Sequence, residues 1–134
     1  MHGLIFFYIQ KFADEATSGK TTWLKLRDTV TASNNRYLPN EVYPDEDAVK
    51  LLQKIADTCG EPLPSLIERF GEFLAPHLIK VAGQHIDPTW RTLDLIENTE
   101  EIIHKMVRAA NPGAEPPVLE TVRHSPNELH LVYS

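Results

Sequence analysis

The sequence predicts an α+β fold, in which an N-terminal helical bundle is followed by a C-terminal antiparallel sheet. Apolar residues recur at helical spacing over most of residues 4 to 110, and two short apolar segments then flank a turn signal. The 134 residues suffice for one domain that buries roughly two-thirds of its unfolded surface. We therefore expect a single domain over residues 1 to 134, with helices first and sheet second.

The composition is that of a globular protein and argues against several functions. Hydrophobic residues make up 42% and charged residues 24% of the chain, and the net charge is −6 with a pI near 5.4. Nucleic-acid modules depend on clustered Lys and Arg, so we expect no nucleic-acid partner. The apolar run at residues 4 to 9 is too short to span a membrane and lacks signal-peptide flanks. Cys59 stands alone before Gly60, so no internal disulfide forms; we expect a half-buried thiol and a cytoplasmic setting.

The first two helices are predicted from apolar spacing and capping residues. Residues 4 to 9 are rich in strand formers, but one helical face fits Ile5, Tyr8, Ile9 and Phe12, and we favour the helix. Thr residues at 21 and 22 precede a second helical segment that directs three apolar residues toward the core: Trp23, Leu24 and Leu26. A loop with Ser33, Asn34, Asn35 and Pro39 should follow.

The next two helices carry clear start and stop signals. Pro44 and three acidic residues begin a helix that Gly60 ends. Its apolar stripe consists of Val49, Leu51, Leu52, Ile55 and Ala56. Ser65 and Glu68 resemble a capping box for the following helix. That helix presents apolar residues at helical spacing: Leu66, Ile67, Phe70, Leu74 and Leu78.

Gly71 and Pro76 break the local rules of this helix, and each has two interpretations. Gly71 costs about 1 kcal/mol relative to Ala inside a helix, and Pro76 deprives the Glu72 carbonyl of its donor. A purely structural interpretation has Gly71 allowing close helix packing and Pro76 introducing a kink. A functional interpretation has Gly71 clearing room for a large flat group.

A long helix from about Thr92 to Ala110 carries His104 at the edge of its apolar face. On a wheel of about 100° per residue, apolar residues spread to one side of His104 and charged residues to the other. A loop with Pro112, Gly113, Pro116 and Pro117 follows and returns the chain toward the imidazole. Val118 to Thr121 and Leu129 to Tyr133 then flank Ser125-Pro126-Asn127, which predicts a hairpin.

Spacing alone leaves the role of His104 open between a structural residue and a ligand. The other histidines, at positions 2, 77, 85, 124 and 130, form no recognisable metal set. No nucleophile with a base partner and no phosphate-binding glycine loop is present, so we do not expect an enzyme. One interpretation is therefore a heme-free helical protein-interaction module in which His104 is structural.

An ordered set of motifs along the whole chain supports a different interpretation. The set comprises Met1 and Gly3, Trp23, Tyr-Pro-Asp-Glu-Asp at 43 to 47, Phe-Gly-Glu-Phe at 70 to 73, the His104 helix, Pro-x-x-x-Pro-Pro at 112 to 117 and a terminal strand ending in Tyr133. In these motifs the chain resembles the heme nitric oxide/oxygen-binding (H-NOX) family, which includes the heme domain of soluble guanylate cyclase.

The resemblance implies a b-type heme between two lobes, with His104 Nε2 as the axial iron ligand and Pro117 pressing on the same side. The distal wall would come from Ile5, Ile9, Phe70, Gly71, Leu74 and Leu78. A neutral histidine leaves the sixth position of ferrous iron open to a diatomic gas. Because these wall residues are apolar or glycine, we expect nitric oxide and carbon monoxide to be bound and oxygen to be disfavoured.

The resemblance also implies sensing, in which ligand binding weakens the iron bond to His104 and the adjoining helix and sheet relax. In bacterial relatives the partner is usually a histidine kinase or a cyclic-nucleotide signalling enzyme. Family members hold the heme propionates with a Tyr-x-Ser-x-Arg motif, which Tyr133 begins here. The chain stops inside that motif, so we expect a domain that lacks its C-terminal part. An uncovered edge strand at 129 to 133 makes a homodimer plausible.

Overall fold

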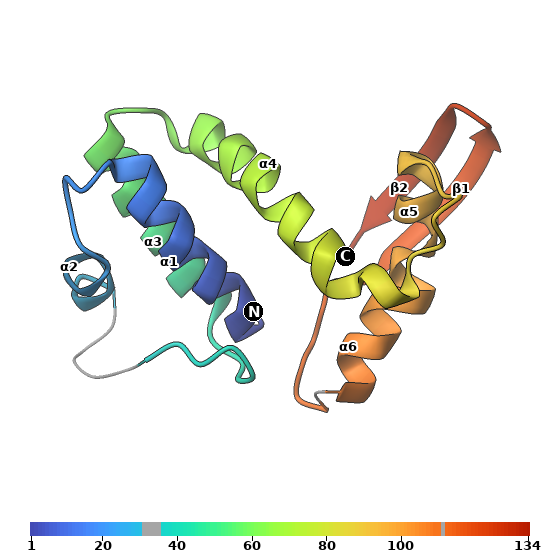
Figure 1. Ribbon diagram of the computed structural model, residues 1–134, viewed down its shortest axis with the longest axis horizontal. Coiled ribbons are helices and arrows are strands. Elements are labelled where there is room, and N and C mark those ends of the chain that lie inside the picture. The colour runs from blue at the N-terminus through green and yellow to red at the C-terminus, as the bar shows by residue number, and fades with distance from the viewer. Residues whose placement is uncertain (31–35, 111) are drawn as a thin grey trace. The chain divides into compact units, whose positions relative to one another are not determined.

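The computed structural model describes residues 1–30, 36–110 and 112–134. Backbone contacts divide the chain into two compact units, Met1–His77 and Leu78–Ser134, and Figure 1 labels their helices and strands. The predicted loop at Ser33, Asn34 and Asn35 lies outside the described residues, whereas Pro39 lies in a turn. Within the described ranges, no helix combines the length and apolar character needed to cross a bilayer.

The first unit is helical, as the apolar spacing predicts. Its elements are α1 (Gly3–Thr17), α2 (Trp23–Asp28), α3 (Asp45–Cys59) and α4 (Leu63–Ala82), the last of which continues into the second unit. The helical interpretation of residues 4 to 9 is thus confirmed by α1. Thr22 caps α2 by accepting a hydrogen bond from the Lys25 amide, and Gly60 ends α3 in a left-handed conformation with φ of 73°.

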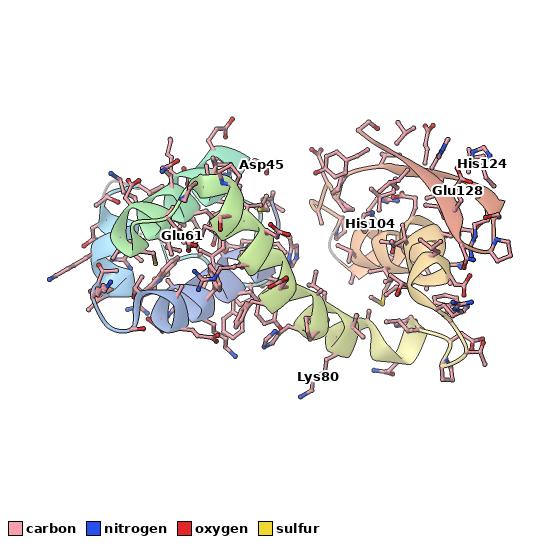
Figure 2. The ribbon with its side chains drawn as sticks, turned by 90° about the horizontal axis from the view of Figure 1, so that it is seen from above. Asp45, Glu61, Lys80, His104, His124 and Glu128 are labelled. Atoms are coloured by element: carbon pink, nitrogen blue, oxygen red, sulfur yellow. The ribbon has the colours of Figure 1, made fainter. Side chains whose placement is uncertain are left out.

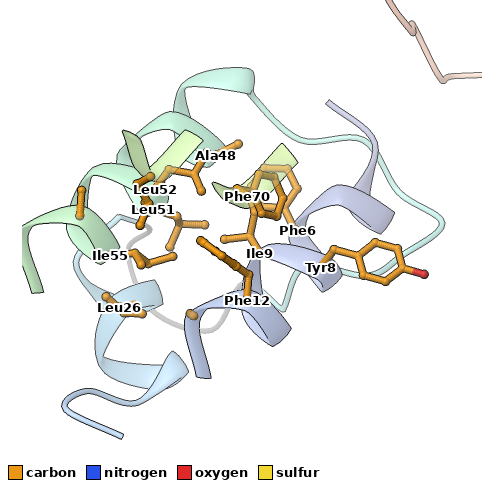
Figure 3. Close-up of a cluster of buried hydrophobic side chains, with 13 residues drawn as sticks. Phe6, Tyr8, Ile9, Phe12, Leu26, Ala48, Leu51, Leu52, Ile55 and Phe70 are labelled. Atoms are coloured by element: carbon orange, nitrogen blue, oxygen red, sulfur yellow. The ribbon is translucent and has the colours of Figure 1, made fainter. Parts of the chain in front are cut away.

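The core of the first unit forms where α1 packs against α3 (Figure 3). Phe6 and Ile9 of α1 and Leu51 and Ile55 of α3 are completely buried. Their spacing of three and four residues places each pair on one helical face. Burial of each such side chain contributes about 1.5–3 kcal/mol, so these four residues hold α1 and α3 together.

Four residues of the predicted apolar faces are instead exposed. Leu24 is 59%, Val49 52%, Ile67 46% and Leu78 37% accessible. The short helix α2 buries only Leu26, and Ala48 rather than Val49 completes the buried stripe of α3. The capping box is also wrong, because α4 begins at Leu63 and Ser65 already lies inside the helix.

The second unit joins a long helical segment to a hairpin. Its elements are η1 (Gly83–His85), α5 (Thr92–Asn98), the π-helix η2 (Thr99–His104), α6 (Lys105–Ala110), β1 (Leu119–Ser125) and β2 (Glu128–Tyr133). The strands pair antiparallel, with Leu119 opposite Tyr133 and Arg123 opposite Leu129. The predicted helix from Thr92 to Ala110 is thus confirmed in extent, and so is the hairpin, but a π-helical turn interrupts the helix.

Gly3 occupies a position at which no side chain fits. A Cβ atom added there would lie 1.8 Å from the Leu38 carbonyl oxygen, which is backbone. The Gly3 amide donates a hydrogen bond of 2.7 Å to the Glu41 carbonyl oxygen, and His2 forms a β-bridge with Val42. The start of α1 is therefore fixed against the segment that leads into α3.

We predict that Gly3→Ala lowers the free energy of unfolding by about 1–3 kcal/mol, because the Leu38 to Glu41 backbone must move. Gly71→Ala is the matched control. Nothing lies within 4 Å of a Cβ atom at Gly71, so alanine should stabilise α4 by up to about 1 kcal/mol. Urea unfolding followed by far-UV circular dichroism measures both variants. Equal stability of Gly3→Ala and the wild type would contradict this account.

Candidate functional site

His104 lies at the end of the π-helical turn η2, not in a regular α-helix. The Lys105 amide donates a hydrogen bond to the Glu100 carbonyl oxygen, five residues earlier, which is the pattern of a π-turn. At the first residue of the turn, the Thr99 hydroxyl donates a hydrogen bond of 2.7 Å to the Leu95 carbonyl oxygen. A π-turn changes the direction of the residues that follow it, so a wheel of regular spacing does not apply at His104.

The imidazole of His104 is oriented by a carboxylate on its own helix. Nδ1 of His104 lies 2.8 Å from Oε2 of Glu100, and the two side chains are only 15% and 18% accessible. An ionised carboxylate can only accept hydrogen bonds, so Nδ1 carries the donated proton. In the neutral ring Nε2 then carries the lone pair, and no group in the described part of the chain pairs with it. This arrangement leaves Nε2 available as a metal ligand.

Glu100 holds three donors at once. Besides His104, its Oε1 accepts a hydrogen bond from the Arg108 guanidinium, and its Oε2 accepts one of 3.2 Å from the Leu119 amide. Burial alone would raise the pKa of Glu100, but the hydrogen bonds from His104, Arg108 and Leu119 outweigh it and hold the pKa below its usual value of 4.5. The carboxylate is therefore ionised at neutral pH.

The Leu119 bond connects the His104 helix to the first residue of β1. Val118 is fixed at the same place, since its amide and carbonyl pair with Ser134 at 2.8 and 3.1 Å. Pro117 is half-buried and directly precedes these two anchored residues. Tyr133 lies opposite Leu119 in the sheet and is 71% accessible. Pro117 and Tyr133, which the resemblance assigns to the heme site, therefore adjoin the strand end that Glu100 holds.

The predicted distal residues all belong to α1 and α4 but differ in burial. Ile9 and Phe70 are core residues, 0% and 7% accessible, so in this structure protein atoms cover them almost completely (Figure 3). Ile5 and Leu74 are half-buried, Leu78 is 37% accessible and Gly71 is exposed. Gly71, Leu74 and Leu78 share one face of α4 by their spacing.

Gly71 does not serve close packing in this structure. A Cβ atom placed there meets no atom within 4 Å among the described residues. Within the first unit, Met1–His77, the interpretation in which Gly71 lets a second helix approach is therefore not supported. The alternative, in which glycine leaves room for a flat group, is compatible with the open space.

Glu100 and Arg108 did not emerge from the sequence as site residues. A signal was nevertheless present, because Glu100, His104 and Arg108 follow one another at intervals of four residues, the spacing of side-chain pairs on a helix. The third partner, the Leu119 amide, is distant in sequence and carries no side-chain signal.

The second unit thus carries a histidine, oriented by a carboxylate, on the helical segment that precedes an antiparallel hairpin. The family model described as "Haem-NO-binding" matches residues 2–134. This chain therefore belongs to the haem-NO-binding (H-NOX) family, a family of haem gas-binding sensors.

Solved structures show the same fold. An H-NOX protein from S. oneidensis in the Fe(II)NO ligation state is 21% identical and superposes with a TM-score of 0.85, covering 100% of this chain and 74% of its own. The unliganded Fe(II) H-NOX protein from K. algicida is 19% identical with a TM-score of 0.72, covering 99% of this chain and 72% of its own. No curated protein matches the sequence of this chain.

We predict that Glu100→Gln destabilises the protein at pH 7 by about 1–3 kcal/mol, because it removes a partly buried, charge-assisted hydrogen-bond acceptor. The folded pKa of Glu100 is lowered, so its contribution is complete above the usual value of 4.5 and is lost as the pH falls through the folded pKa. The difference from the wild type should therefore shrink in acid.

Glu101→Gln is the matched control, since Glu101 is the exposed neighbour of Glu100. Urea unfolding at a series of pH values, followed by circular dichroism, measures all three proteins. A Glu100→Gln difference that stayed constant down to the acid limit, or equalled that of Glu101→Gln, would refute the assignment.

Proposed function

We propose that this chain is a nitric oxide sensor that binds heme b through Nε2 of His104. The observation that carries the proposal is the hydrogen bond between Glu100 and His104 Nδ1, which leaves Nε2 as the free nitrogen. Histidines that bind metals generally donate their other ring proton to a carboxylate, a carbonyl or water. The rival interpretation, a heme-free interaction module, gives no reason for a half-buried histidine to keep Nε2 unpaired.

The chemistry of the His104 side chain suits an axial ligand of a heme iron. A ferrous heme held by one neutral histidine supplies a sixth coordination position that is open to a diatomic gas. Glu100 accepts the Nδ1 proton, which fixes the ring orientation and makes the imidazole a stronger donor. Gly71 places no side chain on its face of α4, and a Cβ added there would meet no described atom within 4 Å, so this position offers no steric obstacle to a flat group.

The residues proposed for the distal wall support nitric oxide and carbon monoxide over oxygen. Ile5, Leu74 and Leu78 present only hydrocarbon, and Gly71 presents no side chain. Oxygen affinity in heme proteins depends on hydrogen-bond donors in the distal pocket. A wall without donors therefore favours the two gases that need them least.

Signal relay would use the connection from His104 through Glu100 to Leu119. A change in the position of the imidazole alters the contact with Oε2 of Glu100, which also accepts the Leu119 amide at 3.2 Å. Such a network can act as a switch only if the two states of the sensor differ in their contact with a partner. We propose a separate signalling enzyme, of the histidine kinase or cyclic-nucleotide class, as that partner, and sensing in place of catalysis.

Reconstitution with hemin tests the heme ligand. We predict that the reduced wild type shows a Soret band, that His104→Gly loses it, and that added imidazole restores it, because the free base can enter the vacated volume. His85→Gly is the control, since His85 is exposed in η1 and should bind heme as the wild type does. A Soret band unchanged in His104→Gly would reject His104, and its absence from the wild type would favour the interaction module.

Gas selectivity forms a separate test. We predict that the reduced heme-loaded protein gives a nitric oxide spectrum under that gas but no stable oxygen spectrum in air. The variant Leu74→Tyr places a phenol donor on the proposed distal face of α4 and should increase oxygen affinity. Stable oxygen binding by the wild type would overturn the selectivity while leaving the role of His104 intact.

A further inference from the structure

A second pair of imidazoles lies at the end of the hairpin, away from His104 in the sequence. Nε2 of His124 and Nδ1 of His130 are 3.1 Å apart, and the ring centroids are 4.2 Å apart. Figure 2 shows His124 and Glu128 at the hairpin, where Pro126 and Asn127 form the turn. Sequence spacing indicated no metal set among these histidines, but the fold brings two of them together.

A β-bulge explains how the two rings meet. Arg123 pairs with Leu129, and the next pair is Ser125 with Glu128, so His124 is the extra residue of β1. A bulge redirects a side chain and increases local twist. His130 pairs with Val122 and therefore shares its face of the sheet. His124, two positions after Val122 in β1, lies on the same face.

The separation of the two nitrogens suits a shared cation. Zinc and related ions bind imidazole nitrogen at about 2.0–2.1 Å, and two such bonds to atoms 3.1 Å apart enclose about 100°. This angle lies between those of square-planar and tetrahedral coordination, which late first-row divalent ions adopt. The two nitrogens now share a hydrogen bond, so chelation requires that its proton be lost and that the two exposed rings rotate until both lone pairs face the ion.

Glu128 supplies the supporting contact. Its Oε1 lies 3.7 Å from Nε2 of His130, the nitrogen that does not face His124. At this distance the carboxylate acts on the ring through its charge and not through a hydrogen bond, and a negative charge beside Nε2 favours a proton there and a lone pair on Nδ1. His130 and Glu128 are 67% and 62% accessible, so an ion can enter from solvent.

We propose that His124 and His130 chelate one late first-row divalent metal ion, of the nickel, copper and zinc group, independently of His104. No group of three or more His, Cys, Asp or Glu side chains suited to a metal occurs within the described ranges, so water completes the coordination. The ion joins β1 to β2 at the bulge and thereby stabilises the hairpin.

Titration of the metal-free full chain with zinc chloride tests this site. We expect one ion per hairpin by isothermal titration calorimetry, with the side-chain NMR signals of His124 and His130 shifting together. His124→Ala and His130→Ala should each weaken binding by about tenfold or more, and Glu128→Gln by a similar or smaller factor. His85→Ala should leave binding unchanged.

Repeating the titration in a His104→Ala background separates this site from the free nitrogen of His104. Binding that persists there and depends on His124 supports the proposal. The proposal would be overturned if zinc binding disappeared in that background, or if neither His124→Ala nor His130→Ala weakened it. The wild-type NMR titration is an independent test, because unshifted His124 and His130 signals at saturating zinc also reject the site.

Discussion

The second unit depends on one carboxylate that is shared among three donors. Glu100 links the imidazole of His104, the guanidinium of Arg108 and the amide of Leu119, so it ties two positions on the helix to the start of a strand. An ionised group in a partly buried position is costly unless its acceptor capacity is used. Here three donors use the acceptor capacity of Glu100. The hydrogen bond from His104 Nδ1 is one of them, and it fixes the orientation of the imidazole.

The π-turn gives this arrangement its geometry. Thr99 to His104 form a widened turn between two short α-helices, α5 and α6. Isolated π-turns occur often at functional sites, because the extra residue redirects a side chain at a small cost in hydrogen bonding. In this chain the redirected residue is His104, and the bonding partner one turn earlier is Glu100.

Much of the fold could be predicted from local patterns in the sequence. Helical spacing located α1, α3 and α4, and the turn residues located the hairpin. The errors came from packing: Val49 lies beside a stripe that Ala48 completes, and Leu24 lies on a helix too short to bury it. The helix around His104 was correct in extent, but spacing rules assume a constant turn and cannot reveal a π-turn.

The candidate sites show the same limit. His104 stood out because of the motifs around it, whereas the link from Glu100 to the strand required knowledge of a contact with a backbone amide nineteen residues away. The pairing of His124 with His130 depended on a bulge, which shifts register without a distinctive residue. Long-range backbone contacts depend on the tertiary structure, and the order of residue types along the chain gives little indication of them.

Oε2 of Glu100 couples the position of the His104 imidazole to the start of β1. The same atom accepts both the imidazole proton and the strand amide, at 2.8 and 3.2 Å. Two donors at one oxygen compete for its electron density, so a shorter bond to one weakens the bond to the other. The position of the imidazole and the attachment of the first residue of β1 are thus coupled through one oxygen atom, so a substitution that moved either would move both.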